Sequence, residues 1–201
     1  MLTKKYTTHK NLEVFLGKTV EAGQADDAIN ASIDIVEKMT GVVFVAGDTV
    51  SARLFNGDGS RELIVDECTG ITKVERGLDQ YGDSFEEIAN TGLSKYILQP
   101  DNYGSKGLPV TSILLRDRYW GKGTQNHRIT AKWGYGATVP PAVQMATTII
   151  AAGIYNYNSA GSGNVKSEKI GNYSVTYSDD EGWDEMERAN KLLQGFKKFS
   201  L

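Results

Sequence analysis

One long stretch of this 201-residue chain carries no charged side chain. No Asp, Glu, Lys or Arg occurs between Lys132 and Lys166. Inside the stretch, Pro140 and Pro141 suit the first turn of a helix, and "AVQMATTIIAAGIYNYN" then predicts about four helical turns. Its most apolar part, "IIAAGI", is far shorter than the roughly 20 residues of a membrane span. A helix that is apolar around most of its circumference is buried on most sides. The stretch therefore predicts either a core helix of one domain or a helix with one face against a neighbouring subunit.

Three other regions have helical patterns. Apolar residues recur at spacings of three and four through residues 25–41, which have two aspartates near their start and Gly41 as a left-handed cap at their end. A shorter helix is predicted for residues 10–16. The closing helix, residues 181–199, has its acids in the first turns and its lysines in the last, as the helix dipole favours.

The region between these helices has strand patterns. Short runs rich in β-branched residues occur along residues 42–136. Within them, "FNGDGSR" contains Asn-Gly and Asp-Gly and predicts a hairpin, while residues 79–92 predict a short helix. The predicted fold class is α+β, with a mainly helical core and an inserted small antiparallel β unit. The predicted organisation is a single domain, 1–201, with helical parts 1–41 and 137–201 and the β insertion at about 42–136.

One further strand is predicted near the end of the chain. In "SEKIGNYSVTYS", residues 167–178, Tyr173, Val175 and Tyr177 alternate with polar residues. A lone strand has unmet hydrogen-bonding groups on both edges and is not stable by itself. Either the β unit of its own chain or the sheet edge of another copy is expected to complete it.

Composition excludes several classes of function. The formal net charge is −3 and the pI about 5.5, so no overall positive field attracts nucleic acid or a membrane surface. Cys68 is the only cysteine, which excludes an internal disulfide. It is expected to be a half-buried thiol, and His9 and His127 to be surface residues, because no catalytic motif surrounds any of them and their spacing suits no metal. We predict no catalytic, metal-binding or cofactor-binding residue.

Several segments, in their order along the chain, resemble a known family. The segments are "VEKMTG", "RLFNGDGSRELIVD", "RITAKWGYGATVPPAVQMATTIIAAGIY" and "SEKIGNYSVTYS". They resemble the head–tail connector (adaptor) proteins of long-tailed bacteriophages. The most specific parts are the "WGYG" turn followed by "VP", and the "IGNYSV" strand.

This resemblance implies a structural virion protein, assembled in the host cytoplasm and located in the neck between head and tail. It implies a ring of identical copies, a dodecamer, that docks beneath the portal protein and extends the DNA channel. The ring would present a docking surface to the next neck protein, the stopper. DNA would pass through without specific binding, and no membrane, enzymatic activity or cofactor is implied. A mildly acidic chain suits a conduit, because a basic lumen would hold DNA phosphates.

Two sets of contact residues are expected. Residues of the uncharged helix and of the strand are predicted at the subunit interface: Ile149, Ile150, Ile154, Tyr157, Tyr173, Val175 and Tyr177. The basic, partly apolar carboxyl tail is predicted to contact the portal through Phe196, Lys197, Lys198 and Phe199.

Two other functions stay open at the sequence level. One is a different neck or tail-completion component. The other is a small cytosolic enzyme or a carbohydrate-binding module, in which aromatic residues of the β unit form a sugar platform: Tyr96, Tyr103, Tyr119 and Trp120. Aromatic residues are more often part of a core.

Overall fold

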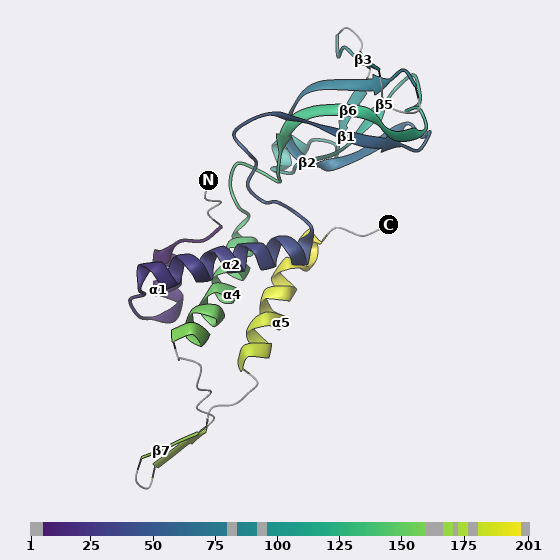
Figure 1. Cartoon of the computed structure of the whole chain (residues 1–201). Coiled ribbons are helices and arrows are strands. Elements are labelled where there is room, and N and C mark those ends of the chain that lie inside the picture. The colour runs from purple at the N-terminus through teal and green to yellow at the C-terminus, as the bar shows by residue number, and fades with distance from the viewer. Residues whose placement is uncertain are drawn as a thin grey trace. The chain divides into compact units, whose positions relative to one another are not determined.

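The computed structural model forms two compact units, which we describe separately. The helical unit comprises residues 1–42 and 139–201, and the sheet unit comprises residues 43–138 (Figure 1). The structure describes residues 6–79, 84–91, 96–159, 167–170, 173–176 and 181–197. The sequence predicts that the two units form one connector domain, and this stays a prediction.

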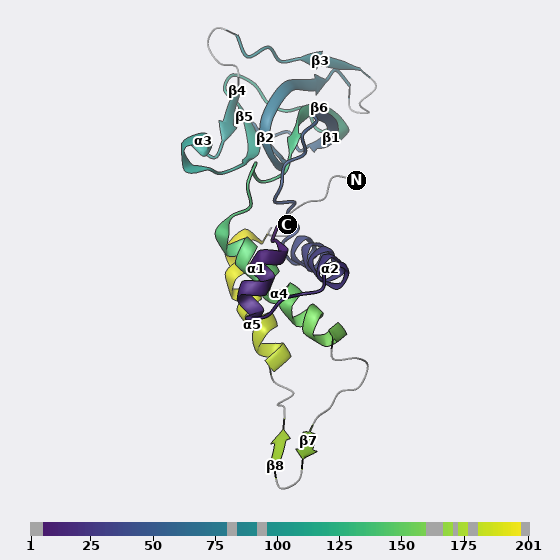
Figure 2. The same ribbon diagram turned by 90° about the vertical axis from the view of Figure 1, so that its left-hand side faces the viewer.

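Four α-helices build the helical unit (Figure 2). They are α1 (His9–Leu16), α2 (Ala22–Thr40), α4 (Pro141–Ser159) and α5 (Glu181–Leu193), and a short 3₁₀ turn, Gln194–Phe196, follows α5. Helix α4 packs against each of the other three. The helices predicted for residues 10–16, 25–41 and 181–199 and after Pro140 are therefore confirmed, with ends that differ by a few residues.

The two ends of α2 show how local sequence sets its bounds. The Glu21 carboxylate caps the helix by accepting hydrogen bonds from the backbone N–H groups of Gly23 and Gln24, at 3.0 and 2.7 Å. These bonds hold the pKa of Glu21 below its usual value. Gly41 ends the helix in the left-handed conformation, with φ of 72°. The helix thus begins before the two aspartates that were predicted near its start.

Helix α4 occupies the centre of this unit. Its buried residues point in almost every direction around the helix: Val143, Ala146, Thr147, Thr148, Ile149, Ile150, Ala151, Ala152 and Tyr155. The hydroxyls of Thr147 and Thr148 donate to backbone carbonyls four residues earlier, so both hydroxyls have a hydrogen-bond partner although they are buried. The uncharged sequence exists because three neighbouring helices cover most of the helix surface.

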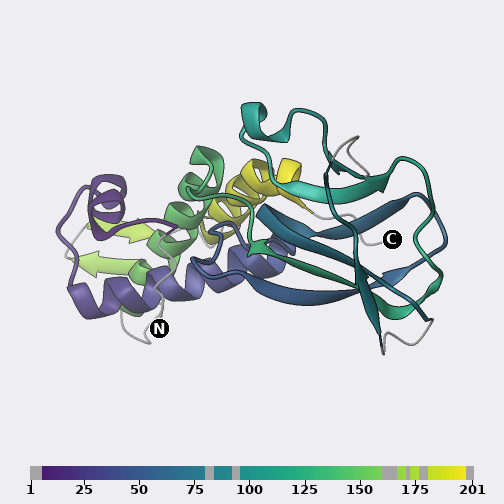
Figure 3. The same ribbon diagram turned by 90° about the horizontal axis from the view of Figure 1, so that it is seen from above.

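The sheet unit contains six strands, and their order is β1-β6-β2-β5-β4, with β3 also paired to β2. Figure 3 shows these strands, blue to green, curving around one another. Their bounds are β1 (Ser51–Gly57), β2 (Glu62–Gly77), β3 (Phe85–Glu87), β4 (Tyr96–Gln99), β5 (Val110–Leu115) and β6 (Gly123–Trp133), and the short helix α3 (Tyr103–Lys106) precedes β5. The pairings between these strands are antiparallel, and outside the strands an isolated parallel bridge joins Val45 and Gly136.

This sheet has a hydrophobic core of its own. The core residues come from β2, β5 and β6 and from adjoining segments: Leu63, Val65, Cys68, Val74, Ile88, Val110, Ile113, Leu115, Trp120, Ile129, Ala131 and Trp133. The predicted fold class, a mainly helical core with a small inserted β unit, is therefore wrong. The protein is a mixed α/β structure in which the described residues form a helical unit and a separate unit with a six-stranded antiparallel sheet.

The long strand β2 joins two segments that the sequence pattern treats as separate strands. Its 16 residues include "ELIVD" and "ITKVER". The first part pairs with β5 and the second with β6, and register shifts around Cys68, Gly70 and Ile71 separate the two. Such irregularities let one strand bend from one set of partners to the other.

The predicted hairpin around "FNGDGSR" is also wrong. Strands β1 and β2 flank this segment, but β6 lies between them, and both pair with β6. The predicted short helix in residues 79–92 is wrong as well, because Phe85–Glu87 forms β3. Turn residues identify where the chain reverses, whereas the neighbour of each strand depends on contacts far apart in sequence.

The strand predicted near the carboxyl end is two strands. β7 (Ser167–Ile170) and β8 (Tyr173–Thr176) pair antiparallel, with Ile170 opposite Tyr173 and Glu168 opposite Val175. The predicted strand is therefore not unpaired, because the first part of its predicted range forms β7, the partner of β8. Only two residues, Gly171 and Asn172, separate the pair in sequence.

Candidate functional site

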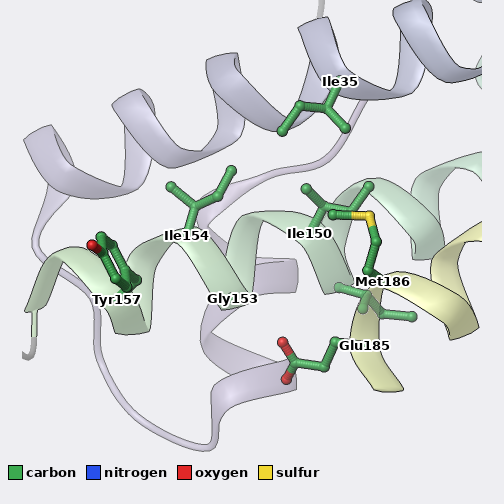
Figure 4. Close-up of a pocket in the computed structure, with 8 residues that line it drawn as sticks. Ile35, Ile150, Gly153, Ile154, Tyr157, Glu185 and Met186 are labelled. Carbon is green, nitrogen blue, oxygen red and sulfur yellow. The ribbon is translucent and has the colours of Figure 1, made fainter. Parts of the chain in front are cut away.

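An open apolar groove runs along the helical unit. Helix α4 forms its floor, Ile35 of α2 forms one wall, and Glu185 and Met186 of α5 form the other (Figure 4). Its volume is about 270 Å³. Helices α2 and α5 both pack on α4 but barely touch each other, which leaves this part of α4 uncovered.

The groove surface is almost entirely hydrocarbon. Ile150, Ile154 and Tyr157 lie in succession along α4 (Figure 4). Tyr157 is 72% exposed and Met186 is 40% exposed. Gly153 lets α5 approach closely, since a Cβ atom there would lie 2.9 Å from Oε2 of Glu185. The groove therefore presents an apolar surface with one carboxylate, that of Glu185, in its wall. Its lining residues are not arranged for catalysis.

All four interface residues predicted on the uncharged helix line this groove. Ile149 is fully buried and Ile150 nearly so, whereas Ile154 is half-buried and Tyr157 projects to solvent. Ile149 and Ile150 thus pack within their own chain, and the accessible part of the set is Ile154 and Tyr157. The groove residues on α2 and α5 were not predicted from the sequence. The apolar helix faces on which Ile35 and Met186 lie are the sequence signal that could have identified these two residues.

The other predicted contacts are distributed elsewhere. Tyr173 and Val175 belong to β8, and Tyr177 lies outside the described residues. On the carboxyl tail, Phe196 is half-buried and Lys197 exposed, while Lys198 and Phe199 also lie outside the described residues.

Cys68 is unsuited to nucleophilic chemistry. It is fully buried in the sheet core, which differs from the expected half-buried thiol. Burial, followed by the negative charges of Glu67 and Asp66, raises the pKa of this thiol to about 12. A thiol with such a pKa is protonated at neutral pH and is a poor nucleophile.

The two histidines lie in different units and in different surroundings. His9, in α1, is half-exposed and its Nε2 lies 2.8 Å from the Asp26 carboxylate. His127, expected at the surface, is fully buried in the sheet unit. Its Nε2 lies 2.9 Å from the Gly121 carbonyl, its ring packs edge-on against Trp120, and its Nδ1 has no hydrogen-bond partner among the described residues.

Acid should destabilise the sheet unit through His127. Burial lowers the pKa of His127 below 6.5, and the charge of Arg76 lowers it further. The unfolded chain therefore binds this proton more readily than the folded protein, so the stability is complete above about pH 6.5 and decreases as the pH falls below that value. Urea unfolding at pH 7.5 and pH 5.5 measures the difference. His127→Gln, whose amide can still donate to Gly121, should reduce the pH dependence; an unchanged dependence would contradict this role.

The aromatic residues considered as a sugar platform do not form one. Trp120 is 1% exposed, and its Nε1–H donates to the Ile113 carbonyl at 3.0 Å. Tyr96 and Tyr103 pack against the sheet core, whereas Tyr119 is 67% exposed. A buried indole cannot stack on a sugar ring.

The described residues contain no group of three or more His, Cys, Asp or Glu side chains placed to hold a metal ion. None of their helices combines the length and the apolar character needed to span a membrane.

Known proteins are similar to this chain in fold and not in sequence. No family of known proteins matches the sequence, and no curated protein matches it significantly. Among solved structures, a chain in the neck of an empty gene transfer agent (GTA) particle, computed with C6 symmetry, is similar with a TM-score of 0.53 and 14% identity. A chain in the neck of the native GTA particle, computed with C12 symmetry, is similar with a TM-score of 0.50 and 13% identity. A chain of the native GTA virion gives the same values as the latter. Each alignment covers 96% of this chain and 89% of the other. At such identity the likeness establishes a shared fold.

Proposed function

We propose that this protein is a structural subunit of the neck of a phage-like particle, where identical copies form a ring. The observation that carries the proposal is the fold, which extends over nearly the whole chain and is similar to that of chains in necks computed with C6 and C12 symmetry. The motifs that resemble head–tail connectors support the same role independently. In this role the protein is located in the virion, needs no cofactor and is not an enzyme.

The apolar groove supports a role in assembly rather than catalysis. Soluble monomers seldom leave large contiguous apolar surface exposed, and such surface often marks a protein contact. Here Ile154, Tyr157 and Met186 present apolar side chains on one side of the helical unit. We assign this groove to the contact between neighbouring copies in the ring.

The finer assignment follows the sequence resemblance. The ring docks beneath the portal protein after assembly in the host cytoplasm, extends the DNA channel and presents a surface to the stopper. Within this proposal, Tyr173, Val175 and Tyr177 lie at the subunit contact, and Phe196, Lys197, Lys198 and Phe199 contact the portal. A different neck or tail-completion position would use the same groove but not the portal contact.

Tyr157→Asp tests the proposed ring. Because Tyr157 is largely exposed in the subunit, its replacement should leave the free energy of unfolding nearly unchanged. A carboxylate at a buried contact carries a large desolvation penalty. We therefore expect the fraction of protein in rings to fall at least about tenfold. Electron microscopy and mass photometry of the protein, alone and mixed with its portal, measure this fraction.

Tyr119→Asp is the matched control, because Tyr119 is similarly exposed but belongs to the sheet unit and does not line the groove. It should assemble like the unchanged protein. If the unchanged protein stays a monomer and adds no density below the portal, the proposed function is wrong. If rings form equally well with Tyr157→Asp, the groove assignment is wrong while the ring remains.

A further inference from the structure

The proposed ring requires two different surfaces on each subunit, and the structure contains a candidate for the second. In a head-to-tail ring, a surface on one copy contacts a different surface on the next. The groove is the first surface. Helix α1 carries the second: Val14 is 75% exposed, and Lys10, also exposed, lies one turn before it.

The two surfaces lie on opposite sides of α4. The chain on either side of α1 is bound to one side of α4, through Thr7 to Thr148 (Oγ1 to Oγ1, 2.7 Å) and the Glu21 amide to the Tyr155 hydroxyl (3.0 Å). Successive residues of an α-helix are rotated by about 100°. Thr148 is therefore roughly 200° from Ile150, and Tyr155 roughly 200° from Tyr157. The groove residues thus face away from α1.

The chemistry of the two surfaces is complementary. On the groove side, Glu185 lines the wall, and the exposed side of α2 next to Ile35 carries Asp27, Asp34 and Lys38. Carboxylates therefore outnumber lysines there by three to one. On the α1 side, Lys10 lies one turn from Val14, whereas Lys18 follows the end of α1 and donates to Asn156 of its own α4 at 3.2 Å. Opposite charges around an apolar centre favour contact between the surfaces and suppress other pairings.

The size of the groove also matches a helix face. Its volume of about 270 Å³ is roughly nine times the volume that one water molecule occupies in the liquid. That space accepts one or two side chains rather than an additional element. A helix lying over such a groove inserts a few side chains spaced three or four residues apart. On α1, Val14 supplies the apolar side chain, and the exposed Lys10, four residues earlier, lies on the same face.

We propose that the α1 face centred on Val14 docks in the groove between α2 and α5 of a neighbouring copy. This inference rests on the proposed function, and it names the two surfaces that the ring contact joins. Lys10 lies towards the carboxylates of the neighbour's groove. Repetition of the contact around a closed circle uses both surfaces of every copy.

Chemical cross-linking of a double-cysteine variant tests the docking. Val14→Cys/Ile154→Cys places one thiol on each surface, and the native Cys68 stays because it is buried. The assembled protein is treated with a short bis-maleimide and separated on a denaturing gel. We expect a ladder of covalent multimers, because each copy is joined to both neighbours. Neither single variant should give a ladder.

Val14→Cys/Lys191→Cys is the matched control, because Lys191 is exposed on α5 and lies roughly 120–140° around that helix from Glu185 and Met186. It should give no ladder. Rings in the electron microscope without a ladder would overturn the docking and leave the ring intact. Products that stop at a dimer would overturn the head-to-tail arrangement. A protein that forms no ring, alone or on the portal, would overturn both proposals.

Discussion

Trp120→Ala should lower the free energy of unfolding of the sheet unit by about 3–5 kcal/mol. The indole is 1% exposed, belongs to the sheet core and packs against His127. Its removal leaves a cavity and also leaves the Ile113 carbonyl without the 3.0 Å hydrogen bond from Nε1. Urea unfolding followed by circular dichroism measures the loss.

Tyr119→Ala is the control beside it, because the adjacent side chain is 67% exposed. Its effect should stay within about 0.5 kcal/mol. Equal effects of the two substitutions would contradict the buried position of Trp120. A specific loss of sugar binding by a stably folded Trp120→Ala variant would instead revive the carbohydrate-binding alternative.

Glu75→Gln should destabilise the sheet unit by about 1–3 kcal/mol. The Glu75 side chain is only 5% exposed and accepts hydrogen bonds from Arg128 at 2.7 and 2.8 Å and from Lys73 at 2.9 Å. The Arg128 hydrogen bonds are the main cause that lowers the pKa of Glu75 to about 2, and Lys73 adds to them. The substitution removes the negative charge and leaves both cations without their shared partner. Urea unfolding at pH 7 measures the change.

The same carboxylate predicts a specific response to strong acid. The folded protein holds Glu75 ionised more firmly than the unfolded chain does, so its contribution is complete above about pH 4.5 and is lost as the pH falls towards 2. Glu75→Gln should lack this part of the acid response. Glu86→Gln is the control, because Glu86 pairs with Arg76 at an exposed site and should cost less than about 1 kcal/mol. Comparable losses for the two variants at pH 7 would refute the special position of Glu75.

Part of the candidate site was predictable from sequence. The absence of charged residues from α4 reflects its burial against neighbouring helices, and the sequence pattern grouped Ile149, Ile150, Ile154 and Tyr157 on that helix. The sequence pattern could not separate the buried members from the exposed ones. That distinction depends on where α2 and α5 leave α4 uncovered, which periodicity along a single helix does not contain.

The errors in the sheet have one physical origin. Short apolar runs and turn dipeptides describe the chain over a few residues. They do not record that β6 comes between β1 and β2, or that one bent strand pairs with both β5 and β6. The burial of His127 and Cys68 was missed for the same reason, because segments distant in sequence cover both side chains.

The sequence by itself determined the helices, most strand positions, the uncharged central helix and the lack of a catalytic motif. These properties follow from periodicity, capping residues and composition, all of which act locally. Only the tertiary structure decided the strand order, the core of the sheet unit and the open groove on α4. These features depend on long-range packing, because the side chains that bury each residue come from segments distant in sequence.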